Sequence, residues 1–250
     1  MEKVQNIIYQ FKICVSLDEY EQAIEYFENI VNFIDEYNYK EVEIINRLVK
    51  KTLRHRRKLL DDIIAMNLAL PQNEINNTQV IEFFTGYAYK ETIEMVHRLQ
   101  TCVVIAYNKI KNDKELALIN KILGKLHAFL YTYEDYDKTI NLETALMYYH
   151  KALELAMANL NKFEVLRYKI YLSYLKFAKS CMKDHYRTML FCINVRKEMK
   201  EIVKKIDLSD NKLISDISII QNKFDAFFDA NIEAYNKVVN IYFPELRTYQ

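Results

Sequence analysis

Glycine and proline are almost absent from this chain, which contains two of each in 250 residues. Sandwiches, barrels and doubly wound sheets need frequent turns, and turns draw on glycine for positive φ angles and on proline for a preset φ. The sequence therefore predicts an all-α fold. Because the nucleotide-binding loops of Rossmann, Walker and kinase sites are rich in glycine, the same scarcity excludes them.

Hydropathy and cysteine spacing limit where the protein works and what it holds. The net charge is +1, and no stretch approaches the roughly 18 consecutive apolar residues of a membrane span. The N-terminus alternates polar and apolar residues, unlike a signal peptide. We therefore expect a cytoplasmic protein, with the nucleus as the alternative location. The four cysteines and five histidines lack the spacing of metal ligands, so we expect no disulfide, metal or cofactor.

Apolar residues recur at i, i+3, i+4 and i+7 along most of the chain, as on one face of an amphipathic helix. Breaks in this pattern predict nine helices at about residues 2–15, 19–34, 40–68, 79–111, 114–134, 140–160, 162–182, 185–206 and 209–229. Asp18 is the expected N-cap of the second helix. We interpret residues 1–229 as one helical domain, and the tail, residues 230–250, is compatible with a further helix to about residue 243.

The densest motif is the basic segment KKTLRHRRK at residues 50–58, in which six of the nine residues are lysine or arginine. A helix turns about 100° per residue, so Lys50, Arg54 and Arg57 share one face. Three neighbouring cations repel one another, and guanidinium groups match the oxygens of phosphate. A solvated face, a site for phosphate or an acidic peptide, and a nucleic-acid contact all remain as interpretations of this row.

With these helix lengths in this order, the chain resembles the 14-3-3 family of adaptors that bind phosphoserine and phosphothreonine. The third helix carries the family's Lys-x6-Arg spacing as Lys50 and Arg57, and Tyr20 stands where the family's second helix begins. The resemblance covers residues 1–229. It implies nine antiparallel helices in a curved right-handed array, with a concave groove that holds an extended partner segment.

The resemblance also implies which residues bind the phosphate. These are Lys50, Arg57 and Lys121, with Arg54 as an added cation where the family has glycine. On the fifth helix, Ala128 and Phe129 replace the arginine and the tyrosine that complete the family's phosphate clamp. A hydrogen bond to a charged group contributes about 1.5–3 kcal/mol, so the loss of the arginine is expected to weaken phosphate binding by about one to two decades.

Further residues are implied as peptide contacts in the groove: Phe129, Leu172, Ser173, Lys176, Ile219, Lys223 and Phe227. Ser173 replaces an asparagine that clasps the peptide in the family. Lys176 and Lys223 stand where neutral residues are usual. These lysines either restore the positive potential that is lost at Ala128, or mark a groove that no longer binds phosphate.

Family members dimerise through the first helix of one subunit and the third and fourth helices of the other. The interface residues that the resemblance implies here are Ile13, Leu17 and Tyr89. The family's charged partners are replaced by Glu19, Gln22, Thr92 and Val96. Surface ion pairs contribute only about 0–1 kcal/mol, so we still expect a homodimer.

No acid, base and nucleophile converge in the sequence, so we do not expect an enzyme. The main interpretation is an adaptor for phosphorylated or acidic protein segments, with no nucleic-acid or membrane partner. The alternative is a phosphate-independent helical scaffold, because segments such as NLETALMYYHKALELA resemble tetratricopeptide helices, although no period of ~34 residues is sustained.

Overall fold

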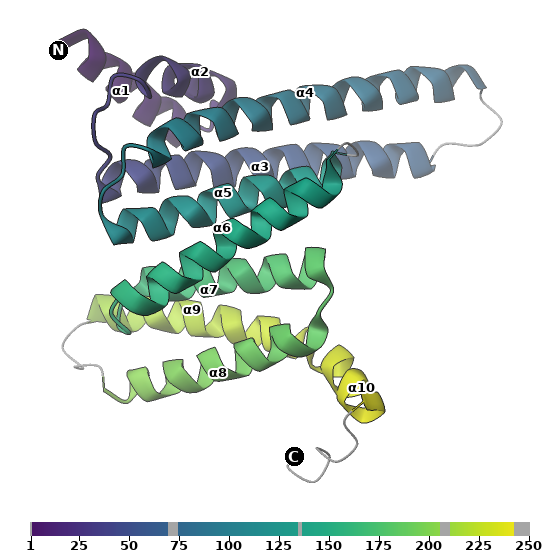
Figure 1. Cartoon of the computed structure of the whole chain (residues 1–250). Coiled ribbons are helices and arrows are strands. Elements are labelled where there is room, and N and C mark those ends of the chain that lie inside the picture. The colour runs from purple at the N-terminus through teal and green to yellow at the C-terminus, as the bar shows by residue number, and fades with distance from the viewer. Residues whose placement is uncertain (1, 70–74, 135–136, 206–210, 243–250) are drawn as a thin grey trace. The chain divides into compact units, whose positions relative to one another are not determined.

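The computed structural model describes residues 2–69, 75–134, 137–205 and 211–242, and all regular structure in these ranges is helical (Figure 1). The elements are α1 (Glu2–Leu17), α2 (Tyr20–Ile30), α3 (Tyr39–Ala69), α4 (Ile75–Tyr107), α5 (Asp113–Tyr133), α6 (Lys138–Asn159), α7 (Val165–Phe177), a π-helical turn η1 (Ala178–Met182), α8 (His185–Val203), α9 (Asn211–Asp229) and α10 (Ile232–Tyr242). The all-α prediction is confirmed for this part of the chain, and α10 confirms the further helix in the tail.

The C-terminal end of α2 differs from the prediction for a clear physical reason. The helix ends at Ile30 rather than near residue 34, and a side chain from elsewhere in the chain binds the carbonyls just beyond this end. The Lys109 ammonium, just after α4, donates to the carbonyl oxygens of Val31, Asn32 and Ile34 at 2.8, 3.0 and 2.7 Å. A lysine distant in sequence therefore caps this helix.

Other boundaries also depart from the predicted positions. The expected N-cap of α2 is wrong, because Asp18 adopts a left-handed conformation, with φ 65°, and bonds to Lys51 instead. Helix α4 begins at Ile75, earlier than residue 79. The helix predicted for residues 162–182 is interrupted, because α7 gives way to the π-helical turn η1, and Lys183 ends that turn with φ 55°.

The chain divides into two compact units, unit 1 (Met1–Tyr148) and unit 2 (Tyr149–Gln250). The boundary falls inside α6. Every residue of the basic segment at 50–58 belongs to unit 1. The single domain over residues 1–229 stays a prediction, and so does the curved array of the 14-3-3 type.

Helix α5 is the centre of unit 1, where it packs against α3 and α4. Most of its side chains between Ala117 and Leu130 are buried, and these include the polar residues Asn120, Lys121 and His127. Helices α3 and α4 run past the end of α5 (Figure 1), and large apolar side chains are exposed on them: Met66, Val80, Phe83, Phe84 and Tyr87. The contact with α5 determines which face of α3 turns inward.

Unit 2 has a core of its own. Helix α7 packs against α9, and α8 packs against α9 and α10. Tyr168, Tyr171 and Phe224 are fully buried in this core. Arg196 of α8 also ties α8 to α9, because its Nε donates to Asp225 at 2.6 Å and its guanidinium lies 4.1 Å from the centroid of the Phe228 ring. Unit 2 is thus held by aromatic packing and by paired arginines, since Arg167 of α7 also lies 3.2 Å from Glu198 of α8.

Candidate functional site

Three cations of α3 form an exposed row on unit 1. Lys50, Arg54 and Arg57 are all exposed, as the helical spacing predicts for residues on one outward face. We call these three residues the cation row. Their guanidinium and ammonium groups give unit 1 a local positive surface although the whole chain has a net charge of only +1.

Two other cations of the same segment serve the packing of unit 1. Arg56 is only 7% exposed, and its Nη2 donates to Glu21 of α2 at 2.8 Å and to Glu91 of α4 at 2.9 Å. Lys51 bonds to Asp18 and, at 3.4 Å, to the carbonyl of Val15. These inward cations have carboxylate partners, so their charge is compensated within the fold.

Arg57 is positioned by aromatic residues of α5. Its guanidinium lies 5.9 Å from the centroid of the Phe129 ring. The Tyr133 ring lies 4.6 Å from Phe129 and 6.4 Å from Tyr89 of α4, measured between ring centroids. Burial raises the pKa of the Tyr133 phenol, and the nearby Arg57 charge partly opposes that shift. No sequence motif indicated Tyr133, although it follows Phe129 by one helical turn on the same face.

The predicted clamp positions on α5 have different environments. Lys121 is 4% exposed and Phe129 is 1% exposed, whereas Ala128 is partly exposed. Lys121 therefore lies beneath the surface and is not a member of the exposed row. Its role as a phosphate ligand stays a prediction.

The predicted groove residues of α7 and α9 belong to unit 2. Lys176, Ile219 and Lys223 are exposed, whereas Leu172 and Phe227 are buried. The Ser173 hydroxyl, which replaces the family's asparagine, lies 3.2 Å from the Tyr149 hydroxyl. These residues stay predictions as peptide contacts, and the exposed three are the ones that a partner can reach in unit 2.

The residues expected at a dimer interface are only partly at the surface. Leu17 is 68% exposed, and Ile13 and Tyr89 are partly exposed. Thr92 and Val96, which replace charged residues of the family, have no exposed surface at all. Burial explains why those two positions carry no charge, since an unpaired buried charge is costly. The dimer stays a prediction.

A closed ring of polar contacts links α4, α5 and α6 within unit 1. His127 Nε2 lies 2.9 Å from Gln100 Nε2, and His127 Nδ1 lies 3.0 Å from Asn141 Oδ1. Asn141 donates to Glu134 at 3.1 Å, and Glu134 lies 3.1 Å from His97 Nε2. His97 Nδ1 closes the ring at 3.2 Å from Gln100 Oε1. Burial lowers the pKa of His127, so the neutral imidazole is favoured in this ring.

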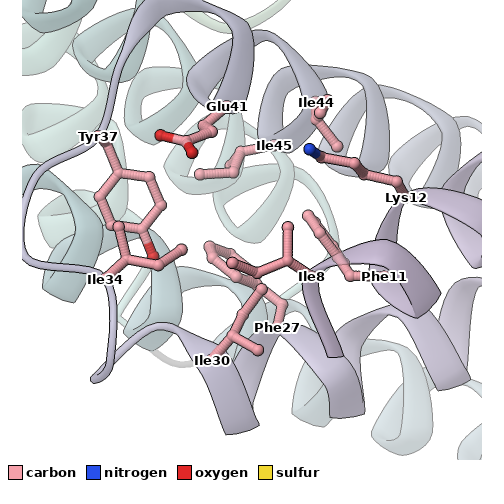
Figure 2. A pocket seen from close by; sticks show the side chains of 10 residues that line it. All are labelled: Ile8, Phe11, Lys12, Phe27, Ile30, Ile34, Tyr37, Glu41, Ile44 and Ile45. Atoms are coloured by element: carbon pink, nitrogen blue, oxygen red, sulfur yellow. The ribbon is translucent and has the colours of Figure 1, made fainter. Parts of the chain in front are cut away.

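A small cavity between α1, α2 and α3 is lined mainly by apolar side chains (Figure 2). The Tyr37 hydroxyl lies among them, and this side chain is 2% exposed, with no hydrogen-bond partner among the described residues. Burial raises the pKa of Tyr37. The cavity volume is about 10 Å³, which is room for one water molecule. This cavity is therefore too small to be a ligand site.

Other observations limit which functions can be assigned to the site. Within the described ranges, no helix has an apolar stretch that could cross a bilayer, and no three potential metal-ligating side chains gather. No protein-family model matches the chain, and no curated protein is significantly similar to it. The chemistry of the exposed and buried side chains therefore carries the functional argument.

Proposed function

We propose that the protein is a non-enzymatic cytoplasmic adaptor, similar to 14-3-3 proteins, that binds phosphoserine, phosphothreonine or acidic segments of partner proteins. The cation row of α3 is the binding surface in this proposal. The observation that carries it is the exposure of Lys50, Arg54 and Arg57 beside inward cations that have carboxylate partners. Three cations that are exposed together on one helical face present a site for an anion.

The position of Arg57 supports this proposal. A flexible arginine loses side-chain entropy when it binds, and a side chain that is already held loses less. The Phe129 ring, whose centroid lies 5.9 Å from the Arg57 guanidinium, restricts this side chain at the surface of unit 1. A guanidinium donates two parallel hydrogen bonds to a phosphate or a carboxylate, which favours an anionic side chain as the ligand.

Partner segments and a second subunit are also part of the proposal. Tyr9 and Leu17 are more than half exposed on α1, and such apolar side chains favour a contact with another chain. The exposed lysines of unit 2, Lys176 and Lys223, would add positive charge for an acidic partner. We therefore propose a homodimer that binds partner segments.

Peptide libraries test the proposal directly. A degenerate library with a central phosphoserine is compared with its unphosphorylated twin at equal ionic strength, and binding is measured by fluorescence anisotropy. We expect at least tenfold tighter binding of the phosphorylated library, because charge-assisted hydrogen bonds form only with phosphate. Equal affinities would exclude phosphate dependence.

Charge reversal locates the site. The double substitution Lys50→Glu and Arg57→Glu is expected to abolish binding of the phosphorylated library. The matched control is Lys40→Glu with Lys58→Glu, which makes the same charge change at other exposed positions of α3. Unchanged binding in the first variant, or an equal loss in both, would show that the cation row is not the specific site.

A second candidate is a phosphate-independent scaffold, which Ala128 and the buried Lys121 favour. Both features reduce the number of cations that a phosphate can reach. A pull-down from lysate with and without phosphatase treatment separates the candidates. The scaffold requires the same partners after treatment, whereas the adaptor requires their loss.

A further inference from the structure

Unit 2 has an open hollow at the surface where α8 and α9 pack against each other (Figure 1). Its volume is about 520 Å³, within the range of roughly 300–1,000 Å³ that small-molecule sites occupy. All but one of its lining residues belong to the last two turns of α8 or to the residue that follows this helix. The lining consists of Lys197, Lys200, Glu201, Val203, Lys204 and Gln221.

The three lysines of this hollow lie on one face of α8, because residues at i, i+3 and i+7 share a face. The Lys204 ammonium donates to Glu201 at 3.0 Å, so the one carboxylate among the lining residues already has a partner. Lys197 and Lys200 are exposed, and neither has a hydrogen bond or an ion pair among the described residues. Two ammonium groups of the hollow are therefore available to a ligand.

The end of α8 explains only part of this cluster. The partial negative charge of a helix C-terminus favours cations, but the effect acts within the last turn. Lys200 and Lys204 are that close to the end of the helix, whereas Lys197 lies nearly two turns before its last residue, Val203. The helix end therefore does not account for Lys197, whereas an anion in the hollow would be bound by it and by Lys200 together.

The chemistry of the lining indicates the class of anion. A lysine is a compact charge that binds phosphoryl groups, without the planar match that arginine offers to a carboxylate. Side chains three residues apart on a helix are neighbours, with Cβ atoms about 5–6 Å apart, so Lys197 and Lys200 can each contact one of two linked phosphoryl groups. Gln221 of α9 adds neutral N–H donors. None of these described lining residues is aromatic, so none can stack on a nucleobase.

We propose that this hollow of unit 2 binds a small ligand that carries a diphosphate group, with Lys197 and Lys200 on the phosphoryl oxygens and Gln221 as a further donor. The rest of the ligand lies against Val203, which is 46% exposed, and against the apolar stems of the lysines. The inference goes beyond the proposed function, which concerns single phosphate groups or carboxylates at the cation row of unit 1.

Inorganic pyrophosphate is the probe that tests the ligand class. It is titrated into the whole chain without divalent cations, and binding is followed by ¹H–¹⁵N chemical shifts. Citrate is the control anion of similar charge without phosphoryl groups, and orthophosphate is the control with a single one. We expect pyrophosphate to bind about tenfold more tightly than either, with the largest shifts at Lys197 and Lys200. Equal binding of pyrophosphate and citrate would overturn the proposal, because it would show only a general attraction of anions.

Neutral substitutions assign the binding to the hollow. Lys197→Gln combined with Lys200→Gln is expected to weaken pyrophosphate binding about tenfold or more, since two charge-assisted contacts are lost. The matched control is Lys169→Gln combined with Lys237→Gln, which removes the same charge from other exposed positions of unit 2. An equal loss in both double variants, or no loss in the first, would show that pyrophosphate does not bind here. Thermal unfolding verifies that each variant keeps its fold.

Glu201→Gln tests the same site in the opposite direction. This substitution removes the carboxylate of the hollow and releases the Lys204 ammonium from its partner. We expect pyrophosphate to bind about threefold more tightly, as the loss of one exposed, screened repulsion allows. A gain in affinity cannot result from a damaged fold. Unchanged or weaker binding would contradict the role of the hollow.

The variant with Lys50→Glu and Arg57→Glu separates this inference from the proposed function. We expect it to bind pyrophosphate like the wild type although it no longer binds the phosphoserine library. A loss of pyrophosphate binding in this variant would place the diphosphate on the cation row and overturn the inference. If the wild type binds pyrophosphate but not the phosphoserine library, the hollow stands and phosphate dependence of the proposed adaptor fails.

Discussion

The two faces of α3 carry the same kind of side chain in opposite surroundings. Arg56 turns inward and is bound by carboxylates of α2 and α4, whereas Arg57, the next residue, is exposed and lies against aromatic rings of α5. The inner arginine contributes to stability because its buried side chain packs in unit 1 and joins α3 to carboxylates of α2 and α4. Arg57 contributes little to the stability of the fold, so its side chain is suited to bind a ligand.

Replacing each of the two arginines in turn is the strongest test of the difference between the two faces of α3. We expect Arg56→Ala to lower the free energy of unfolding by about 2 kcal/mol, because a buried side chain is truncated and two ion pairs with partly exposed carboxylates are lost. Arg57→Ala is expected to cost less than about 1 kcal/mol, since its side chain is exposed. Urea denaturation followed by circular dichroism measures both values. Similar losses in the two variants would mean that the two faces do not differ as described.

A change of pH is a further test of the buried contacts, because the ring of polar contacts contains the buried His127. The pKa of His127 is lowered in the fold, so the unfolded chain takes up this proton first. The stability is complete above the unfolded pKa of about 6.5 and is lost as the pH falls through it. We expect the wild type to lose up to about 1 kcal/mol between pH 7.5 and 5.5.

His127→Gln is the variant that tests this assignment, with His55→Gln as the control at an exposed position of α3. The pH dependence of the unfolding free energy is expected to become flatter in His127→Gln and to stay unchanged in His55→Gln. An unchanged slope in the first variant would assign the acid sensitivity to other groups. The charges of Glu134 and His97, two other members of the ring, act on His127 in opposite directions. Glu134 raises the pKa of His127, and His97 lowers it.

The smallest expected effect on binding concerns Asp61, an acidic residue next to the exposed face of α3. Asp61→Asn is expected to strengthen binding of the phosphoserine library about twofold, because one weakly screened repulsion is removed at the surface. Asp62→Asn, the adjacent exposed aspartate, is the matched control. A gain of the same size in both variants would indicate a general effect of net charge rather than proximity to Arg57.

The sequence predicted the helices well, because their apolar periodicity is strong and the chain has so few turn residues. It could not predict the carboxylate partners of Arg56, because these lie on α2 and α4, far away in the sequence. The end of α2 was equally hidden, since its carbonyls are bound by Lys109, which is distant in sequence. The π-helical turn after α7 has no marker such as glycine or proline.

The candidate site was predicted in part. Helical spacing correctly placed Lys50, Arg54 and Arg57 on one exposed face. The same spacing said nothing of the burial of Lys121, which depends on the packing of α5 against two helices. No motif indicated Tyr133, whose ring contacts Phe129 at 4.6 Å between centroids.

The ammonium of Lys109 has a consequence for how the segment between α2 and α3 withstands proteases. Three of its backbone carbonyls bind this one group, so the loop is tied to the end of α4 near its middle. Proteolytic cleavage requires several residues to unfold into an extended form, and here they must first release a charge-assisted contact. We therefore expect this connection to resist cleavage as long as unit 1 stays folded.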